Sequence, residues 1–149
     1  MLKVLRRMLE TAPADTHAVP AHERRQLQLA VAVLMHEARR ADYTEGDVES
    51  RRAQDALAEI FGLPPDESAA LLEEGRARAQ QLTSLYAPVS VIKRDFSLHE
   101  RVRLIEHLWR VAFAHRGLDP YEDHYVHKVA HLLYVPNTQS MLARNRARA

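Results

Sequence analysis

The sequence predicts an all-α single domain of about seven helices, in which two similar helical hairpins surround a buried central helix. Three observations support this prediction. Apolar residues recur at the three- and four-residue spacing of a helix face over most of the chain. Only four glycines interrupt a chain rich in alanine, leucine, arginine and glutamate. The two halves of the chain also resemble each other in sequence at a nearly constant offset.

The composition is that of an ordinary globular protein. The 149 residues include 46% hydrophobic and 28% charged side chains, and the formal net charge is +1. Because this charge creates no overall attraction to nucleic acid, a nucleic-acid partner is not expected. The lack of cysteine excludes disulfides and thiolate metal ligands. No apolar run is long enough to span a membrane, so we expect a cytoplasmic protein.

Residues 1–20 predict a short basic amphipathic helix followed by a linker that contains two prolines. Leu2, Leu5 and Leu9 lie on one side of this helix. They are expected to dock on the protein's own core or on a second copy in a homodimer, with a membrane surface or another partner as the alternative. The domain itself is expected at residues 21–143, and residues 144–149 are expected to form a frayed basic tail.

The first long helix of the domain is predicted at residues 22–41. Its centre is apolar on nearly every side, which is typical of a buried central helix. A second helix is predicted at residues 47–61, where Gly62 provides a stop. A third is predicted at residues 65–83. Pro88 should then break the chain before a short helix or turn at residues 89–96.

Residues 104–133 carry the clearest pattern, which predicts a helical hairpin. Ser97 and Glu100 have the spacing of a capping box that opens the first helix of this hairpin. Gly117 ends that helix, and Asp119 followed by Pro120 is a typical start for the next. A last short helix is predicted after Pro136.

The hairpin repeats an earlier part of the chain. Glu49 corresponds to Glu122 at an offset of 73 residues, and the proline corner at 63–64 corresponds to the corner at 135–136 at an offset of 72. Each half reads as a helix, a polar turn, a second helix and a proline corner. The economical interpretation is one core built from two hairpins related by a pseudo-twofold axis.

Residues 27–142 resemble the TerB-like domains associated with tellurite resistance, in particular their short stand-alone bacterial members. Four segments in the right order carry the resemblance, namely EARRAD at 37–42, FGLP at 61–64, LWRVAFA at 108–114 and LDPYE at 118–122. The resemblance implies an all-helical fold, a bacterial stress-associated setting and a metal-linked role.

Five side chains are candidate ligands for a divalent metal ion. Helical periodicity places Glu49 and Glu122 inside the apolar faces of their helices and Glu37 at the edge of such a face. Asp42 and His115 lie at the matching turns. If the two halves pack about their pseudo-twofold axis, these side chains converge into a site rich in carboxylate oxygens. Two alternatives stay open: helix caps and ion pairs, or a catalytic acid.

The other candidate groups have simpler explanations. His124, His127 and His131 form one helical stripe opposite the apolar face, which predicts a solvated surface rather than a zinc site. Trp109 is expected in the core. The sequence contains no phosphate-binding glycine loop, no nucleophile elbow and no zinc-protease motif.

These patterns lead to one functional hypothesis with two rivals. The hypothesis is a non-enzymatic bacterial TerB-like accessory protein, which binds a divalent metal ion or a partner protein in tellurite resistance or a related stress response. The partner would be membrane-associated or chaperone-like. One rival is a pure protein-protein interaction module without a metal. The other is a small metal-dependent enzyme.

Overall fold

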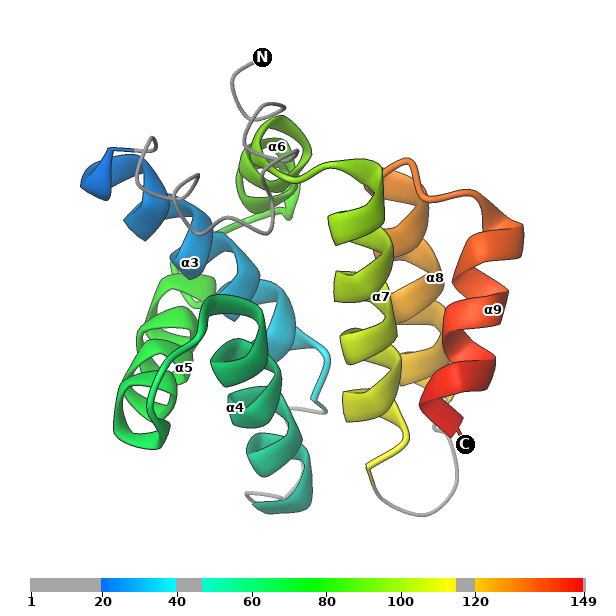
Figure 1. Ribbon diagram of the computed structural model, residues 1–149, viewed down its shortest axis with the longest axis horizontal. Helices are drawn as coiled ribbons and strands as arrows, with labels where there is room; N and C mark the ends of the chain where they lie inside the picture. The colour runs from blue at the N-terminus through cyan, green and yellow to red at the C-terminus, as the bar shows by residue number, and fades with distance from the viewer. Residues whose placement is uncertain (1–19, 40–46, 115–119, 149) are drawn as a thin grey trace.

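The protein folds as a helical bundle (Figure 1). The computed structural model describes residues 20–39, 47–114 and 120–148, and these residues form seven helices and no strand. The predicted all-α fold is therefore confirmed. Within the described ranges, no helix is both long enough and apolar enough to cross a membrane.

Helix α3 (Ala21–Glu37) is the central helix that the sequence predicts. Its residues from Ala30 to Met35 are all buried, so that stretch of the helix is covered on every side. Helices α5 (Pro65–Ala79) and α6 (Tyr86–Asp95) pack against it most closely. Helices α4 (Asp47–Phe61) and α7 (Leu98–Ala112) also touch it.

The helices form two similar three-helix units. Helices α3, α4 and α5 make the first, and α7, α8 (Pro120–Leu132) and α9 (Asn137–Arg148) make the second, with α6 between them in the chain (Figure 1). In both units the third helix packs mainly against the first. Contacts between α4 and α7 join the two units. This arrangement agrees with the predicted duplication.

The matching ends of α4 and α8 show the duplication at the level of single hydrogen bonds. Gly62 follows α4 with φ 66°, and Tyr134 follows α8 with φ 58°, so both adopt the left-handed conformation common at helix ends. In the first unit the backbone N–H of Leu63 donates to the carbonyl oxygen of Ala58 at 3.1 Å. In the second unit the backbone N–H of Val135 donates to the carbonyl oxygen of Ala130 at 2.9 Å. All of these positions differ by 72 residues.

The following helices begin in the same way in both units. The backbone N–H of Ser68 donates to the carbonyl oxygen of Pro64, and that of Ser140 donates to Pro136, at 3.0 Å in both cases. Both serines are buried, with exposed fractions of 2% and 1%. The offset is again 72, whereas Glu49 and Glu122 differ by 73. The first unit thus holds one more residue than the second between its buried acid and the left-handed residue after the helix, Gly62 or Tyr134.

The predicted capping box is present at the start of α7. The Glu100 backbone N–H donates to Ser97 Oγ at 3.2 Å, and the Ser97 backbone N–H donates to Glu100 Oε1 at 2.8 Å. These two bonds satisfy donors that a helix start leaves unpaired. The sequence therefore located this helix start correctly.

The prediction that Pro88 breaks the chain was wrong. Helix α6 begins at Tyr86 and includes Pro88 in its first turn. A proline is tolerated there because the first backbone N–H groups of a helix have no partner within the helix. The Tyr86 N–H donates to Ser84 Oγ at 3.2 Å, which supports the earlier start.

Two helices end before their predicted limits. Helix α3 ends at Glu37 and α5 ends at Ala79, instead of at residues 41 and 83. Side-chain contacts hold the turn after α3, where the Arg39 guanidinium reaches across to Ser50 on α4. At the end of α3, this tertiary contact overrides the local preference of the chain for helix.

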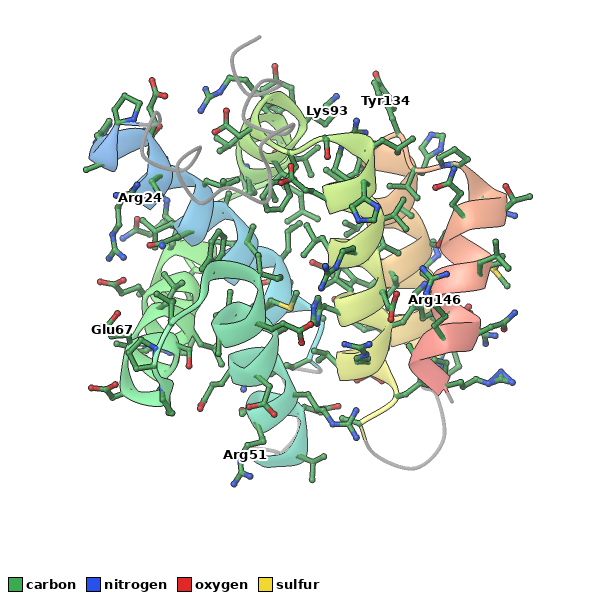
Figure 2. The ribbon with its side chains drawn as sticks, in the orientation of Figure 1. Arg24, Arg51, Glu67, Lys93, Tyr134 and Arg146 are labelled. Atoms are coloured by element: carbon green, nitrogen blue, oxygen red, sulfur yellow. The ribbon has the colours of Figure 1, made fainter. Side chains whose placement is uncertain are left out.

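The C-terminal helix is longer than predicted, because α9 continues through Arg148 where a frayed tail was expected from residue 144. Arg146 Nε donates to Glu106 Oε1 at 2.7 Å, and this side chain lies between α9 and α7 (Figure 2). The Arg144 guanidinium lies 5.2 Å from the centre of the Trp109 ring. These contacts between α9 and α7 extend the helix.

Candidate functional site

Two carboxylates lie inside the core. Glu49 is 1% exposed and Glu122 is 0% exposed, and each is the third residue of its helix, α4 or α8. Glutamates are almost never buried this completely unless hydrogen bonds, an opposite charge or a metal ion compensate the lost hydration. Both acids therefore lie where the helical periodicity placed them, at corresponding starts of the duplicated helices.

The other three candidate ligands are distributed differently. Glu37 is the last residue of α3 and is partly buried, which raises the pKa of its carboxyl group. Asp42 and His115 lie outside the described residues. Among the side chains that the structure describes, no three acids or histidines gather as one ligand group, so Glu37, Glu49 and Glu122 do not by themselves form such a site.

Hydrogen bonds between polar side chains connect α3 to α4 at Ser50, the residue after Glu49. Arg39 donates from Nη1 to Ser50 Oγ, and its Nη2 lies 2.8 Å from His36 Nδ1. Burial and the positive charges of Arg39 and Arg76 lower the pKa of His36 to about 4. His36 is therefore neutral near pH 7, and its Nδ1 accepts the hydrogen bond from Arg39.

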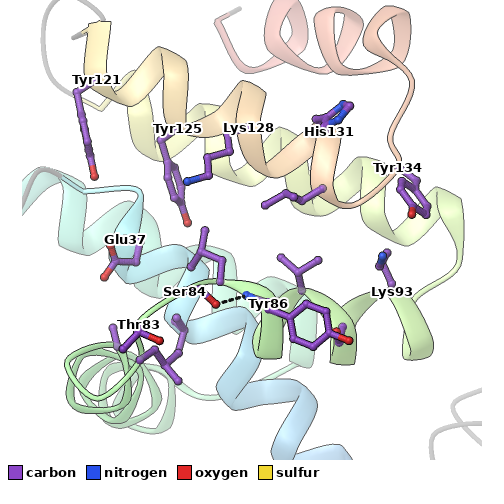
Figure 3. Close-up of a pocket in the computed structure, with 17 residues that line it drawn as sticks. Glu37, Thr83, Ser84, Tyr86, Lys93, Tyr121, Tyr125, Lys128, His131 and Tyr134 are labelled. Carbon is purple, nitrogen blue, oxygen red and sulfur yellow. Dashed lines mark hydrogen bonds between the residues drawn. The ribbon is translucent and has the colours of Figure 1, made fainter.

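A pocket of about 750 Å³ lies between α3, α6 and α8 (Figure 3). The turn at residues 82–85 and the residues after α8 complete its wall. Its volume falls in the range of sites that bind small molecules in proteins. Glu37, the last residue of α3 and one of the predicted metal ligands, is the acid in the lining of this pocket.

Tyrosine side chains gather around this pocket. Tyr86, Tyr121 and Tyr134 are 78%, 46% and 72% exposed, which is unusual for such large side chains. Tyr125 is 6% exposed. These four are all the tyrosines in the described part of the chain, and every one of them lines the pocket.

Two lysines also line the pocket. Lys93 extends from α6 and Lys128 from α8, on facing walls in Figure 3. The sequence holds only three lysines among its 21 lysine and arginine residues, so two of the three lie here. The Lys93 ammonium lies 4.2 Å from the centre of the Tyr134 ring, a cation-π contact.

The pocket wall next to α3 is held by Tyr125. Its hydroxyl donates to the carbonyl oxygen of Leu34 at 3.0 Å. Burial raises the pKa of Tyr125 well above 10, and the nearby Glu37 charge contributes to the same change. Tyr125 therefore stays protonated at physiological pH and acts as a fixed hydrogen-bond donor between α8 and α3.

The sequence did not indicate this pocket. Its tyrosines are spread over residues 86–134, and no local motif connects them. Two features of the sequence could have pointed to it. Lysine is scarce in this arginine-rich chain, and Lys128 follows Tyr125 by three residues, which places both on one helix face. The other segments that line the pocket lie far from α8 in the sequence, and only the tertiary fold brings them together.

The histidine stripe on α8 is only partly solvated. His124 and His131 are exposed as predicted, and His131 lines the pocket. The side chain of His127 is 39% exposed, and its ring also packs edge-on against Trp109 with 5.2 Å between ring centres. Trp109 is fully buried, as expected of a core residue.

Comparison with known proteins gives one match. A family model described as tellurite resistance protein TerB matches residues 28–145, which include most of the chain and parts or all of every described helix. The comparisons with curated proteins and with solved structures gave no significant match.

Proposed function

The chain belongs to the TerB family of tellurite resistance proteins, and we propose that it is a non-enzymatic accessory protein that binds a divalent metal ion. The setting of this binding is tellurite resistance or a related bacterial stress response. The ion is held between the two halves of the duplicated domain. The metal-bound and metal-free forms of the protein then differ in their activity as an accessory protein.

One observation carries the proposal: the two units each bury one glutamate at the start of corresponding helices. Glu49 and Glu122 are both at most 1% exposed. Carboxylate oxygens suit hard cations such as magnesium, calcium and manganese. The described residues supply too few ligands for a complete site, so the proposal includes Asp42 and His115, which lie outside the described residues. A bound ion would neutralise the acids and link the two units.

Thermal unfolding with and without metal tests the proposal. The protein is purified without a metal-affinity tag, treated with chelator, and melted in the presence of calcium, magnesium, manganese or zinc. An ion present at about 100 times its dissociation constant stabilises the folded state by about 2.7 kcal/mol. We expect one of these ions to raise the melting temperature, and Glu49→Gln and Glu122→Gln to remove that increase.

The control is Glu59→Gln, which changes a glutamate on the same helix α4 whose side chain is 53% exposed. This variant should keep the full response to metal. If no ion changes the melting temperature of the chelated wild type, or if the two buried-site variants respond as the wild type does, the metal proposal is incorrect.

A partner protein is the second candidate mode of action. Two large apolar side chains on the packed helices α7 and α9 are exposed, Leu98 by 38% and Leu142 by 56%, and both are suited to contact another protein. In this case the buried acids are structural. The Glu49→Gln and Glu122→Gln variants would then change stability but would leave binding of the partner intact.

A further inference from the structure

We propose that the pocket between α3, α6 and α8 binds a small organic anion, in which a carboxylate or phosphate is attached to a flat apolar body. Lys93 and Lys128 hold the anionic group, and the tyrosines around the opening hold the apolar body. This site is separate from the buried glutamates, and the inference does not depend on a metal.

The interior of the pocket suits an apolar body. Its volume of about 750 Å³ is in the range of small-molecule sites. Aliphatic side chains from α3, α6, α8 and the turn between α5 and α6 form much of its lining, namely Val33, Leu82, Leu85, Val89 and Leu132. Burial of an apolar ligand against these side chains would supply non-directional affinity.

The rim of the pocket suits a flat ligand. Tyr86, Tyr121 and Tyr134 come from three different segments and are exposed around the same opening (Figure 3). They are three of the six large hydrophobic side chains that are exposed in the described part of the chain. Tyrosine rings offer a flat apolar face and a hydroxyl group that binds polar atoms, with little conformational freedom to lose.

The charges in the pocket favour an anion. Its lining contains two lysines and one acid, Glu37. Within the described ranges neither lysine forms an ion pair, whereas arginines elsewhere do, such as Arg103 with Glu59 at 3.2 Å and Arg110 with Glu106 at 2.8 Å. The ammonium groups of Lys93 and Lys128 are therefore available to bind a carboxylate or phosphate oxygen.

The backbone at Tyr134 provides independent support. Tyr134 has φ 58°, a conformation that costs stability in a residue with a side chain, and the duplicated position in the first unit is Gly62 with φ 66°. Glycine would therefore suit the backbone at residue 134 better than tyrosine does. The tyrosine places an aromatic ring at the rim beneath the Lys93 ammonium, which is a role that glycine cannot fill.

The test uses calorimetric titration of the full chain with three probes: 2-naphthoate, 1-naphthyl phosphate and the neutral 2-naphthalenemethanol. We expect saturable binding of at least one anion, about ten-fold or more tighter than binding of the neutral probe, because a hydrogen bond to a charged group contributes on that scale. Which anion binds more tightly identifies the head group. Binding of neither anion, or equal binding of the neutral probe, would overturn the proposal.

Variants locate the site. Lys93→Gln combined with Lys128→Gln should weaken anion binding about ten-fold or more and should leave binding of the neutral probe unchanged. The matched control is Arg51→Gln combined with Arg103→Gln, which removes two exposed charges outside the pocket lining. Equal affinity in the lysine variant and the control would place the anion elsewhere and overturn the assignment.

Tyr134→Gly separates a binding role from a structural one. Glycine relieves the unfavourable backbone conformation, so the melting temperature should rise or stay unchanged. The affinity for the anion should nevertheless fall several-fold, because the ring and its contact with Lys93 are lost. A variant that is more stable and binds the anion as tightly as the wild type would show that Tyr134 has no part in the site.

Discussion

His36 shows how a single side chain connects the fold to pH. It lies at the end of α3 as a neutral imidazole that accepts a hydrogen bond from Arg39. Its pKa is about 4 in the folded protein and near the ordinary 6.5 in the unfolded chain. Between these values the unfolded chain binds more protons than the folded chain. Stability contributed by this group is therefore lost as the pH falls.

We expect the free energy of unfolding to decrease between pH 6.5 and pH 4, and to decrease less in His36→Gln, which keeps an acceptor for Arg39 but does not titrate. The difference should stay well below about 3 kcal/mol, because solvent screens the partly exposed ring. Urea unfolding across this pH range measures it. His107, whose pKa burial also lowers, contributes equally in both proteins. The same pH dependence in both would contradict the assignment.

The two buried glutamates and the tyrosines illustrate what a sequence reveals at the residue scale. The burial of Glu49 and Glu122 was predictable, because an acid within the apolar stripe of a helix faces the core together with that stripe. Tyr134 was not, since only the structure shows its left-handed backbone and its place beside Lys93. Local patterns report which face of a helix is buried, but they do not report which distant segments share a pocket.

At the scale of helices, the crossing of α5 over α3 depends on one glycine. A Cβ atom at Gly75 would lie 2.7 Å from the backbone carbonyl carbon and from the Cβ of Ala32. Both neighbours belong to the buried central helix, which has little freedom to move. The absence of a side chain at Gly75 therefore permits the closest contact between these two helices.

We expect Gly75→Ala to destabilise the protein by about 1–3 kcal/mol, because overpacking outweighs the gain of up to about 1 kcal/mol in helix propensity. Chemical denaturation measures the change. Ala70→Gly, at an exposed position of the same helix, is the control for propensity and should cost about 1 kcal/mol. An increase in stability for Gly75→Ala would show that the two helices separate easily.

Helix starts that carry a local capping motif were more predictable than helix ends. The capping box of Ser97 and Glu100 is a local motif, and the structure contains both of its hydrogen bonds. The end of α3 and the length of α9 depend on contacts between helices, such as the one between Arg146 and Glu106, whose residues are 40 positions apart. Sequence periodicity contains no information about such contacts, so the predicted end came too late in α3 and too early in α9. Helix α5 also ends earlier than predicted.

At the scale of the whole molecule, the two units share one core. The buried apolar side chains form a single cluster that includes residues from every described helix. Units that share a core should not unfold separately, and domains of this size usually unfold in one step. The duplication in sequence therefore should not produce two independent folding units.

This expectation is testable because the chain contains one tryptophan, Trp109, which is buried in the second unit. Its fluorescence reports on the second unit, while far-ultraviolet circular dichroism reports on all helices. We expect both signals to give the same midpoint in urea unfolding. Two separate midpoints would mean that the units unfold independently and that the contacts between α4 and α7 contribute little.

The metal content of the protein is the most direct test of a metal ion bound by the two buried glutamates, Glu49 and Glu122. Untagged wild-type protein and the double variant Glu49→Gln/Glu122→Gln are purified in parallel, and their divalent metals are quantified by elemental analysis. We predict close to one equivalent of a divalent metal per chain in the wild type and its loss in the double variant. Wild-type protein without bound metal, or equal metal in both proteins, would contradict the claim.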